Sequence, residues 1–203
     1  LKDVIGEHCK HYLKAAPDLF KFPETLEPRT SFQVSATKTH TVNQYVRHCP
    51  PLLREQLTNL YSNMEVASVS KDNIDTLVKR IAPAAGFHRG AIYLLEPESR
   101  LLMPRLTIGE AKASEFTPVQ YSASDLGANP ILNAYRSGAP IMEQNAQLDG
   151  RVVSFIAGIL GHLQKVGVLY LEISPHLAKN RNFNAMACFK AIRQSLSDCL
   201  NLT

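Results

Sequence analysis

The chain has 203 residues, 45% of them hydrophobic and 20% charged, which is enough for one large domain, or one ordinary domain plus an appendage, around a sizeable core. Its net charge of +4 comes from 22 basic and 18 acidic residues interspersed along the sequence, and without a basic stripe we expect no nucleic-acid partner. No stretch approaches the roughly 18 uninterrupted apolar residues of a membrane-spanning helix, so we expect no membrane partner either.

The cysteines and the start of the chain indicate the compartment. Leu1 to Tyr12 lacks the pattern of a signal peptide, and a disulfide framework is not expected in a chain of this size. The cysteines are far apart and form no Cys-x-x-Cys pair: Cys9, Cys49, Cys188 and Cys199. We therefore expect a cytoplasmic protein. Because the chain begins with Leu rather than Met, we also expect a fragment of a longer intracellular protein.

Residues 1–51 differ in composition from the rest. A helix is predicted over Val4–Ala16, but five prolines lie between positions 17 and 51, and residues 30–41 are rich in Ser and Thr. Such a composition is typical of a linker. We predict that residues 1–51 are an N-terminal helix and connector, or the tail of an upstream module, and that residues 52–203 form the domain.

Two amphipathic helices are predicted at the start of this domain. The first carries an apolar face at helical spacing, formed by Leu53, Leu57, Leu60 and Met64. In the second, Asp72 is the expected N-cap and Gly86 the stop. Its apolar stripe consists of Ile74, Leu77, Val78, Ile81 and Ala85.

Strands follow the helices. Gly90–Glu96 is apolar enough to be buried on both faces, and a turn over residues 97–100 leads into a second strand, Leu101–Ile108. Pro104 cannot donate to a ladder, so we expect an edge position or a bulge there. Later in the chain we predict a short helix capped by Asn129, a short strand and a long hairpin: Pro130–Arg136, Ile141–Met142, Val152–Leu160 and Val166–Ile173.

The last segment, Asn184–Leu200, is predicted to be a helix with apolar residues at alternating spacings of four and three, namely Ala185, Phe189, Ile192, Leu196 and Cys199. Two interpretations remain open. The stripe packs on the sheet of its own domain, or it forms a homodimer contact.

This order of elements resembles that of GAF domains. The resemblance is carried by residues 91–95 (Ala-Ile-Tyr-Leu-Leu), residues 134–141 before the third strand, the Gly-Val-Leu strand at residues 166–171, and the final helix. It implies an α/β (α+β) fold with a central antiparallel sheet, the N- and C-terminal helices packed on one face. A ligand pocket on the other face would be built from residues 106–129, the helix at Pro130 and the sheet.

The resemblance also implies which residues contact a ligand, without identifying that ligand or any cofactor. The candidate ligand-binding residues are Tyr93, Met103, Tyr121, Asp125, Asn129, Tyr135 and Phe155. Asp125 is either a pocket carboxylate or a turn former. More weakly, the whole chain resembles the C-terminal part of bacterial signalling proteins in which a GAF-like domain follows an HDOD module, which implies an output domain upstream.

Signatures of specific activities are missing. The Asn-Lys-x-x-x-Phe-x-x-x-Asp-Glu string of cyclic-nucleotide GAF domains does not occur, and Cys188 and Cys199 lie on the final helix rather than in pocket loops, where bilin-binding and methionine-sulfoxide-reducing relatives carry cysteines. The sequence also lacks a Gly-x-Ser-x-Gly elbow, a phosphate loop and a His-Glu-x-x-His pair. We therefore expect no catalytic residues.

One metal hypothesis remains, a zinc site in the N-terminal part. Its candidate ligands do not follow a standard zinc spacing, and scattered unliganded residues are the favoured interpretation, so no metal is predicted: His8, Cys9, His11, His40, His48 and Cys49.

The sequence thus predicts a non-catalytic sensory or regulatory GAF-like domain of a bacterial signal transduction protein that binds an unidentified small molecule. The alternative is a degenerate scaffold that serves dimerisation or protein docking without a ligand.

Overall fold

The computed structural model describes residues 43–64, 69–121, 129–161, 164–180 and 182–202. The predicted helix over Val4–Ala16, the Ser/Thr-rich run at 30–41 and the candidate ligand residue Asp125 lie outside these ranges, as do four of the six candidate zinc ligands. In the described part of the chain, no helix is long and apolar enough to cross a membrane.

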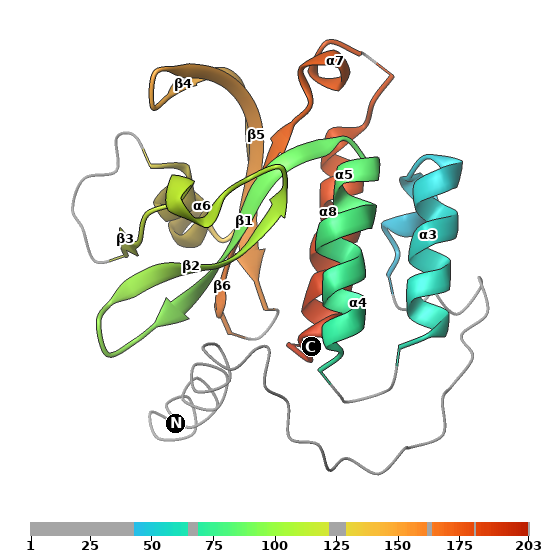
Figure 1. Ribbon diagram of the computed structural model, residues 1–203, viewed down its shortest axis with the longest axis horizontal. Coiled ribbons are helices and arrows are strands. Elements are labelled where there is room, and N and C mark those ends of the chain that lie inside the picture. The colour runs from blue at the N-terminus through green and yellow to red at the C-terminus, as the bar shows by residue number, and fades with distance from the viewer. Residues whose placement is uncertain (1–42, 65–68, 122–128, 162–163, 181, 203) are drawn as a thin grey trace.

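A six-stranded antiparallel sheet forms the centre of the molecule, with strand order β3-β2-β1-β6-β5-β4 (Figure 1). The predicted antiparallel α+β fold is confirmed. The strands are β1 Phe87–Glu96, β2 Leu101–Gly109, β3 Val119–Gln120, β4 Ile141–Leu148, β5 Arg151–Leu160 and β6 Gly167–Ile173.

The N- and C-terminal helices cover one face of this sheet, and α6 (Pro130–Ser137) covers the other (Figure 1). Between β6 and the last helix lies the short α7 (Pro175–Ala178), and η3 (Ala113–Glu115) precedes β3. The elements on the first face are η1 Val46–His48, α3 Pro51–Ser62, α4 Lys71–Thr76, η2 Leu77–Ile81, α5 Ala82–Ala84 and α8 Ala185–Cys199. We call this face the helix face.

The second predicted helix is continuous from α4 through the π-helical turn η2 to α5, and Gly86 ends it with a φ of 96°. The prediction that Asp72 caps this helix was wrong. The side chain of Ser70 accepts a hydrogen bond from the backbone N–H of Asn73 at 3.4 Å, which makes Ser70 the N-cap. Asp72 lies in the first turn, where its charge still favours the helix dipole.

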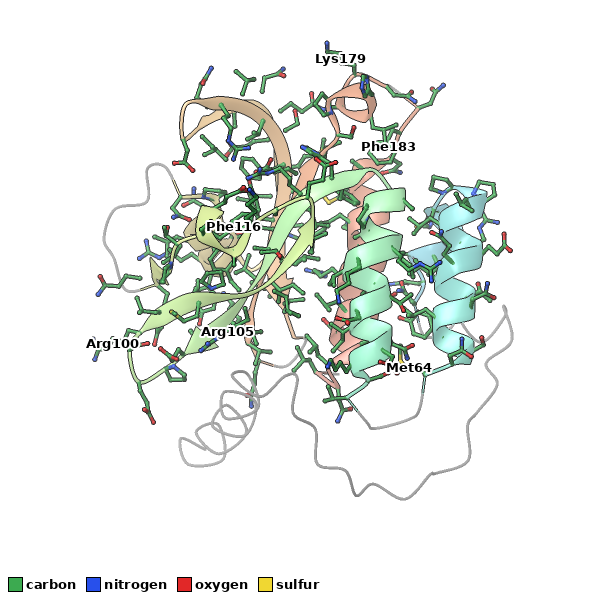
Figure 2. The ribbon with its side chains drawn as sticks, viewed as in Figure 1. Met64, Arg100, Arg105, Phe116, Lys179 and Phe183 are labelled. Atoms are coloured by element: carbon green, nitrogen blue, oxygen red, sulfur yellow. The ribbon has the colours of Figure 1, made fainter. Side chains whose placement is uncertain are left out.

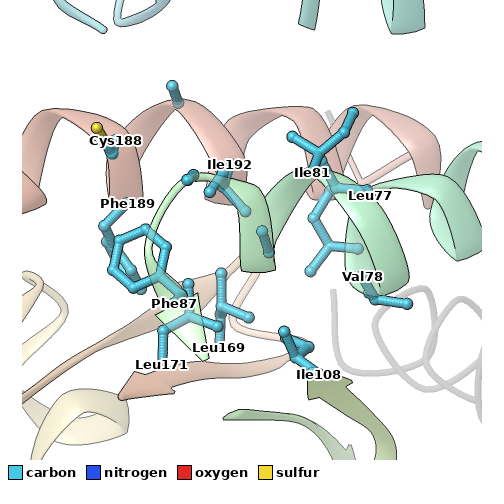
Figure 3. Close-up of a cluster of buried hydrophobic side chains, with 14 of the residues drawn as sticks. Leu77, Val78, Ile81, Phe87, Ile108, Leu169, Leu171, Cys188, Phe189 and Ile192 are labelled. Carbon is cyan, nitrogen blue, oxygen red and sulfur yellow. The ribbon is translucent and has the colours of Figure 1, made fainter. Parts of the chain in front are cut away.

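The main core lies between the sheet and the helices that cover the helix face (Figure 3). The apolar stripe of α8 is fully buried in it: Phe189 and Ile192 pack with Leu169 and Leu171 of β6 and with Phe87 of β1. Of the two interpretations of this stripe, packing inside its own domain is the one observed. A dimer contact through α8 would have to use other residues.

Residues 43–51, which the sequence placed in the connector, pack against this core. Val46 and Cys49 are buried, and the fully buried Asn43 donates hydrogen bonds from Nδ2 to the hydroxyl of Tyr61 and to the carbonyl of Ala191 at 3.1 and 2.9 Å. The folded body therefore begins no later than Asn43, before the expected start at Leu52.

Most strand predictions hold, with two differences in length. β1 begins at Phe87 rather than Gly90, and β4 runs to Leu148 rather than ending at Met142. The missed part of β4 is mostly polar because it belongs to a largely exposed edge strand, in which only Ala146 and Leu148 pack on the sheet. The expected bulge near Pro104 is present: the register shifts between Ile92 and Tyr93, which pair with Leu106 and Pro104.

Candidate functional site

Six aromatic side chains gather on the α6 side of the sheet, in a cluster that we call the aromatic face: Tyr93, Phe155 and Tyr170 from the strands, Tyr135 from α6, and Phe116 and Tyr121 from the segments beside β3. Tyr93, Phe155 and Tyr170 form an inner layer that is buried. Phe116, Tyr121 and Tyr135 form an outer layer that is half-buried. Phe116 joins the two, because its ring meets those of Tyr93 and Tyr170 edge-on with centroids 6.3 and 6.2 Å away.

Strand alternation produces the inner layer of this face. Successive side chains of a strand point to opposite sides, so Tyr93 of β1, Tyr170 of β6 and Phe155 of β5 face α6 while their neighbours enter the helix-face core. The rings of Phe155 and Tyr170 lie 5.4 Å apart between centroids. Ile131, Leu132 and Ala134 of α6 close the inner layer from above.

The position of α6 is fixed at both ends. The side chain of Asn129 accepts hydrogen bonds from the backbone N–H groups of Ile131 and Leu132 at 2.9 and 3.2 Å. At the other end, Gly138 has a φ of 72°, and Lys165 Nζ donates to the carbonyl of Tyr135 at 2.8 Å. Tyr135 is held beside Tyr121, with ring centroids 5.6 Å apart.

The predicted ligand residues therefore fall into distinct places. Tyr93, Tyr121, Tyr135 and Phe155 are brought together on the aromatic face. Asn129 lies beside it, with its side-chain oxygen engaged in capping α6. Met103 pairs across the strands with Leu94, a residue of the helix-face core, which places Met103 on the opposite side of the sheet.

A chain of four alternating charges adjoins the aromatic face, and sequence reasoning missed it. Glu172 of β6 is only 2% exposed and lies between two arginines: Arg89 Nε is 3.3 Å and Arg151 Nη2 3.4 Å from its carboxylate. Arg89 also binds Glu115 of η3 at 2.5 Å. The order of charges is thus Glu115, Arg89, Glu172, Arg151. Tyr170 donates from its hydroxyl to Glu172 at 3.2 Å, which links the charges to the aromatic face.

Strand register brings the centre of the charge chain together. Arg89 pairs directly with Glu172, so both side chains point to the side of the sheet that carries Tyr93 and Tyr170. A β-bulge at His88, just before this pair, turns Phe87 to the helix face instead. The sequence held one signal of this arrangement. A Glu inside the apolar run Val166–Ile173 has to be paired if it is buried, because an uncompensated buried charge is costly. The partners, however, lie far from it along the chain.

A cleft of about 480 Å³ opens at the end of the charge chain. The pairing of β5 with β6 starts at Phe155, so residues 151–154 extend past β6 and stand opposite α7 across the cleft (Figure 1). Lys179 stands directly after α7 (Figure 2). The polar and charged side chains that line the cleft include His88, Gln144, Arg151, Ser154, Glu172 and Lys179.

The two buried tyrosines of the aromatic face stay protonated at neutral pH. Burial raises the pKa of Tyr170 above its usual value of 10.0, and the charge of Glu172 raises it further. Burial also raises the pKa of Tyr93, with a smaller effect from Asp149. Both hydroxyl groups therefore act as neutral hydrogen-bonding groups.

The described cysteines lie away from this site. Cys49, Cys188 and Cys199 are free thiols buried in the helix-face core, and a hydrogen bond with Cys188 together with burial raises the pKa of Cys49. Within the described ranges, no group of three or more His, Cys, Asp or Glu side chains is arranged to hold a metal ion. His48 is exposed and Cys49 is buried, and the other candidate zinc ligands lie outside those ranges.

No protein-family model matches the chain, and no curated protein sequence matches it. Among solved structures, the GAF domain of an Acinetobacter phosphoenolpyruvate-protein phosphotransferase aligns with a TM-score of 0.50 at 19% identity, covering 73% of this chain and 90% of that one. The fold is GAF-like.

Two further structures resemble this GAF-like fold less closely in TM-score. A free methionine-R-sulfoxide reductase from Neisseria meningitidis, solved with its substrate, aligns with a TM-score of 0.49 at 15% identity, over 89% of this chain and 97% of that one. A GAF domain/HD domain protein from Geobacter sulfurreducens aligns with a TM-score of 0.42 at 13% identity, over 83% and 95%.

Proposed function

We propose that the chain is a non-catalytic regulatory module of an intracellular bacterial signalling protein and that it binds a small molecule on the α6 side of its GAF-like sheet. The main support is the two-layered aromatic face. Its inner layer is buried, while Phe116, Tyr121 and Tyr135 of the outer layer are half-buried and offer apolar surface, to which the two tyrosines add polar hydroxyl groups. The adjoining cleft adds charged and polar groups, as ligand sites require.

The proposed output runs through the sheet to the helix face. Strands β1 and β6 carry aromatic-face residues and core residues in alternation, so a ligand that shifts Tyr93 or Tyr170 also moves Ile92 and Leu171. The core packs these residues against α8, and α8 holds Asn43, close to the point where an upstream output domain would connect. A ligand would therefore bias the geometry of that connection.

The non-catalytic part of the proposal has support in the chemistry of the face. The described cysteines are buried on the opposite side of the sheet, and the buried acid Glu172 is held by two arginines rather than poised to exchange a proton with a substrate. An assay of free methionine-R-sulfoxide reduction with the purified chain is expected to show no turnover. Thiol-dependent turnover would overturn this part.

The ligand-binding part is tested by native mass spectrometry and by thermal denaturation against a metabolite library. We expect a bound species, or a compound that raises Tm, whose effect is lost in Tyr121→Ala. The matched control is Leu52→Ala, a 60% exposed apolar residue on α3, which should leave the effect intact. If no compound stabilises the chain and no bound species is found, the proposal fails.

A specific observation favours the alternative, a scaffold without a ligand. Tyr93, Phe155 and Tyr170 are 3%, 1% and 4% exposed, so side chains already fill the inner part of the face. If the scaffold hypothesis holds, the chain associates with itself or with a partner domain, and Tyr121→Ala changes neither Tm shifts nor assembly. Sedimentation of the wild type and of Tyr121→Ala, beside the library screen, separates the two functions.

A further inference from the structure

The two arginines of the charge chain differ in the number of carboxylates that they contact. Arg89 has a carboxylate on each side, Glu115 and Glu172, and is mostly buried. Arg151 has a carboxylate on one side only: its two terminal nitrogens lie 3.5 and 3.4 Å from the oxygens of Glu172, and its side chain is 46% exposed in the cleft. A guanidinium carries five N–H donors, so Arg151 keeps donors for a further acceptor.

The cleft itself has an excess of positive charge. Its lining contains two cationic side chains, Arg151 and Lys179, one histidine, His88, and one carboxylate, Glu172. The charge of Glu172 is already compensated by two guanidinium groups, so it adds little negative potential to the cleft. Lys179 is exposed and forms no ion pair among the described residues. A cation entering the cleft would have to displace an arginine from Glu172, whereas an anion displaces nothing.

We propose that the cleft between β5 and α7 binds a small organic anion, a carboxylate or phosphate, as the fifth member of the alternating charge chain. Arg151 contacts the anion directly, Lys179 supplies the second cation, and Glu172 is a positioning residue that orients the Arg151 guanidinium. The inference rests on the proposed function, because it names the class of ligand that such a module takes.

Geometry and size agree with this class. A planar guanidinium held by one carboxylate presents its remaining N–H groups in a fixed fork, the arrangement that binds carboxylate and phosphate oxygens best. Ser154 and Gln144 in the wall of the cleft offer neutral hydrogen bonds, and the volume of about 480 Å³ suits a small metabolite rather than a polymer. The apolar part of such a ligand would meet Val152 and Val153.

The test is an NMR titration of the full chain with three probes: inorganic phosphate, succinate, and succinamide as the uncharged counterpart of succinate. We expect saturable shifts of the backbone amides of residues 151–154 and 172–179 with phosphate or succinate, and none with succinamide. Saturation by phosphate alone identifies a phosphate site, and saturation by succinate alone a carboxylate site. Equal shifts with succinamide would overturn the proposal, because recognition would not depend on charge.

Variants locate the binding groups. Arg151→Met should weaken anion binding about tenfold or more, because it removes a charge-assisted contact. Arg151→Met also leaves Glu172 with one partner fewer, so a second variant is needed. Lys179→Gln changes an exposed residue that forms no ion pair among the described residues, and it should weaken anion binding about two- to fivefold. Arg80→Met, an exposed arginine on η2, is the matched control and should bind as the wild type does. Unchanged affinity in both Arg151→Met and Lys179→Gln would overturn the site.

The failures of the two proposals can be told apart. If the library screen yields a neutral ligand that depends on Tyr121, while phosphate and succinate give no saturable shift, the regulatory module stands and the anion site is wrong. If neither the screen nor the titration yields binding, both proposals fall.

Discussion

Glu172 shows how one buried charge organises a surface. A carboxylate removed from water costs several kcal/mol unless opposite charges and hydrogen bonds compensate it. Here Arg89, Arg151 and the Tyr170 hydroxyl provide that compensation from three strands. The same contacts hold the guanidinium groups of Arg89 and Arg151 in place, and Arg151 lies in the wall of the cleft.

Replacing Glu172 by Gln is expected to destabilise the fold by about 1.5–3 kcal/mol, because the hydrogen bonds from Arg151 and Tyr170 lose their charged acceptor and Arg89 loses one of its two ion pairs. Urea unfolding at neutral pH measures the change. Glu96→Gln is the control: Glu96 pairs with Arg105 at 3.0 Å but is 34% exposed, so its loss should cost less than about 1 kcal/mol. Equal losses for the two variants would contradict the structural role of Glu172.

The raised pKa values of the buried tyrosines predict how the stability of the fold changes at alkaline pH. Burial, followed by the charge of Asp198, raises the pKa of Tyr61 above 10.0, and the pKa values of Tyr93 and Tyr170 rise for the same first reason. Above pH 10.0 the unfolded chain loses these protons while the native chain keeps them, so stability present below that pH declines as pH rises. Burial also raises the pKa of Cys199 from 9.0 to about 12, so the decline starts near pH 9.0.

The variant that isolates this effect is Tyr61→Phe. It should be less stable than the wild type at neutral pH, yet lose stability less steeply above pH 10.0, by up to about 1.4 kcal/mol per pH unit for one titrating group. Ser195→Ala perturbs the same hydrogen-bond network, through Asn43, without removing a phenol, and should keep the wild-type slope. Unfolding measured across a pH series checks both. If stability falls with pH equally steeply in Tyr61→Phe and in the wild type, the pKa of Tyr61 is not raised in the folded chain.

At the scale of elements, the helices and strands with periodic apolar patterns were predicted most accurately. The stripes of α3 and α8 and the strands β1, β5 and β6 were predictable because each buries apolar side chains at a fixed spacing. The outer half of β4 was not, since an exposed edge strand needs no apolar alternation. Four of the candidate ligand residues meet on one face because strand alternation and the α6 cap place them there. The charge chain depends on contacts between residues that lie far apart along the sequence, which no local pattern encodes.

Asn129 offers a test at this scale, because the sequence predicted both a ligand contact and the helix cap for it, and the structure confirms the cap. Asn129→Ala should destabilise the fold by about 1 kcal/mol, and Asn129→Asp should keep the stability, since Asp accepts the same two backbone hydrogen bonds. Thermal denaturation compares the three chains. A loss in Asn129→Asp as large as in Asn129→Ala would mean that capping is not the main role of this residue.

On the scale of the whole molecule, the two sides of the sheet differ in what they carry. One side packs every described terminal element into a continuous core, and the other carries the aromatic face, the charge chain and the cleft. Because the sheet is a single layer, each strand residue on the ligand side has neighbours that contact the helices. This arrangement lets the proposed ligand side influence the chain at Asn43 without any contact to it.

The segment just before α3 should therefore matter for folding as well as for connection. A chain that starts at Leu52 loses the buried side chains of Val46 and Cys49 and the hydrogen bonds of Asn43, and should be less stable than a chain that starts at Asn43 by about 3 kcal/mol or more. In the full chain, Val46→Ala should cost about 1–3 kcal/mol, while the exposed neighbour Arg47→Ala should cost little. Urea unfolding measures all four proteins. Equal stability of the two truncated chains would show that the folded body begins at Leu52, and that the proposed signal from the sheet would have to leave the domain through α3 rather than through Asn43.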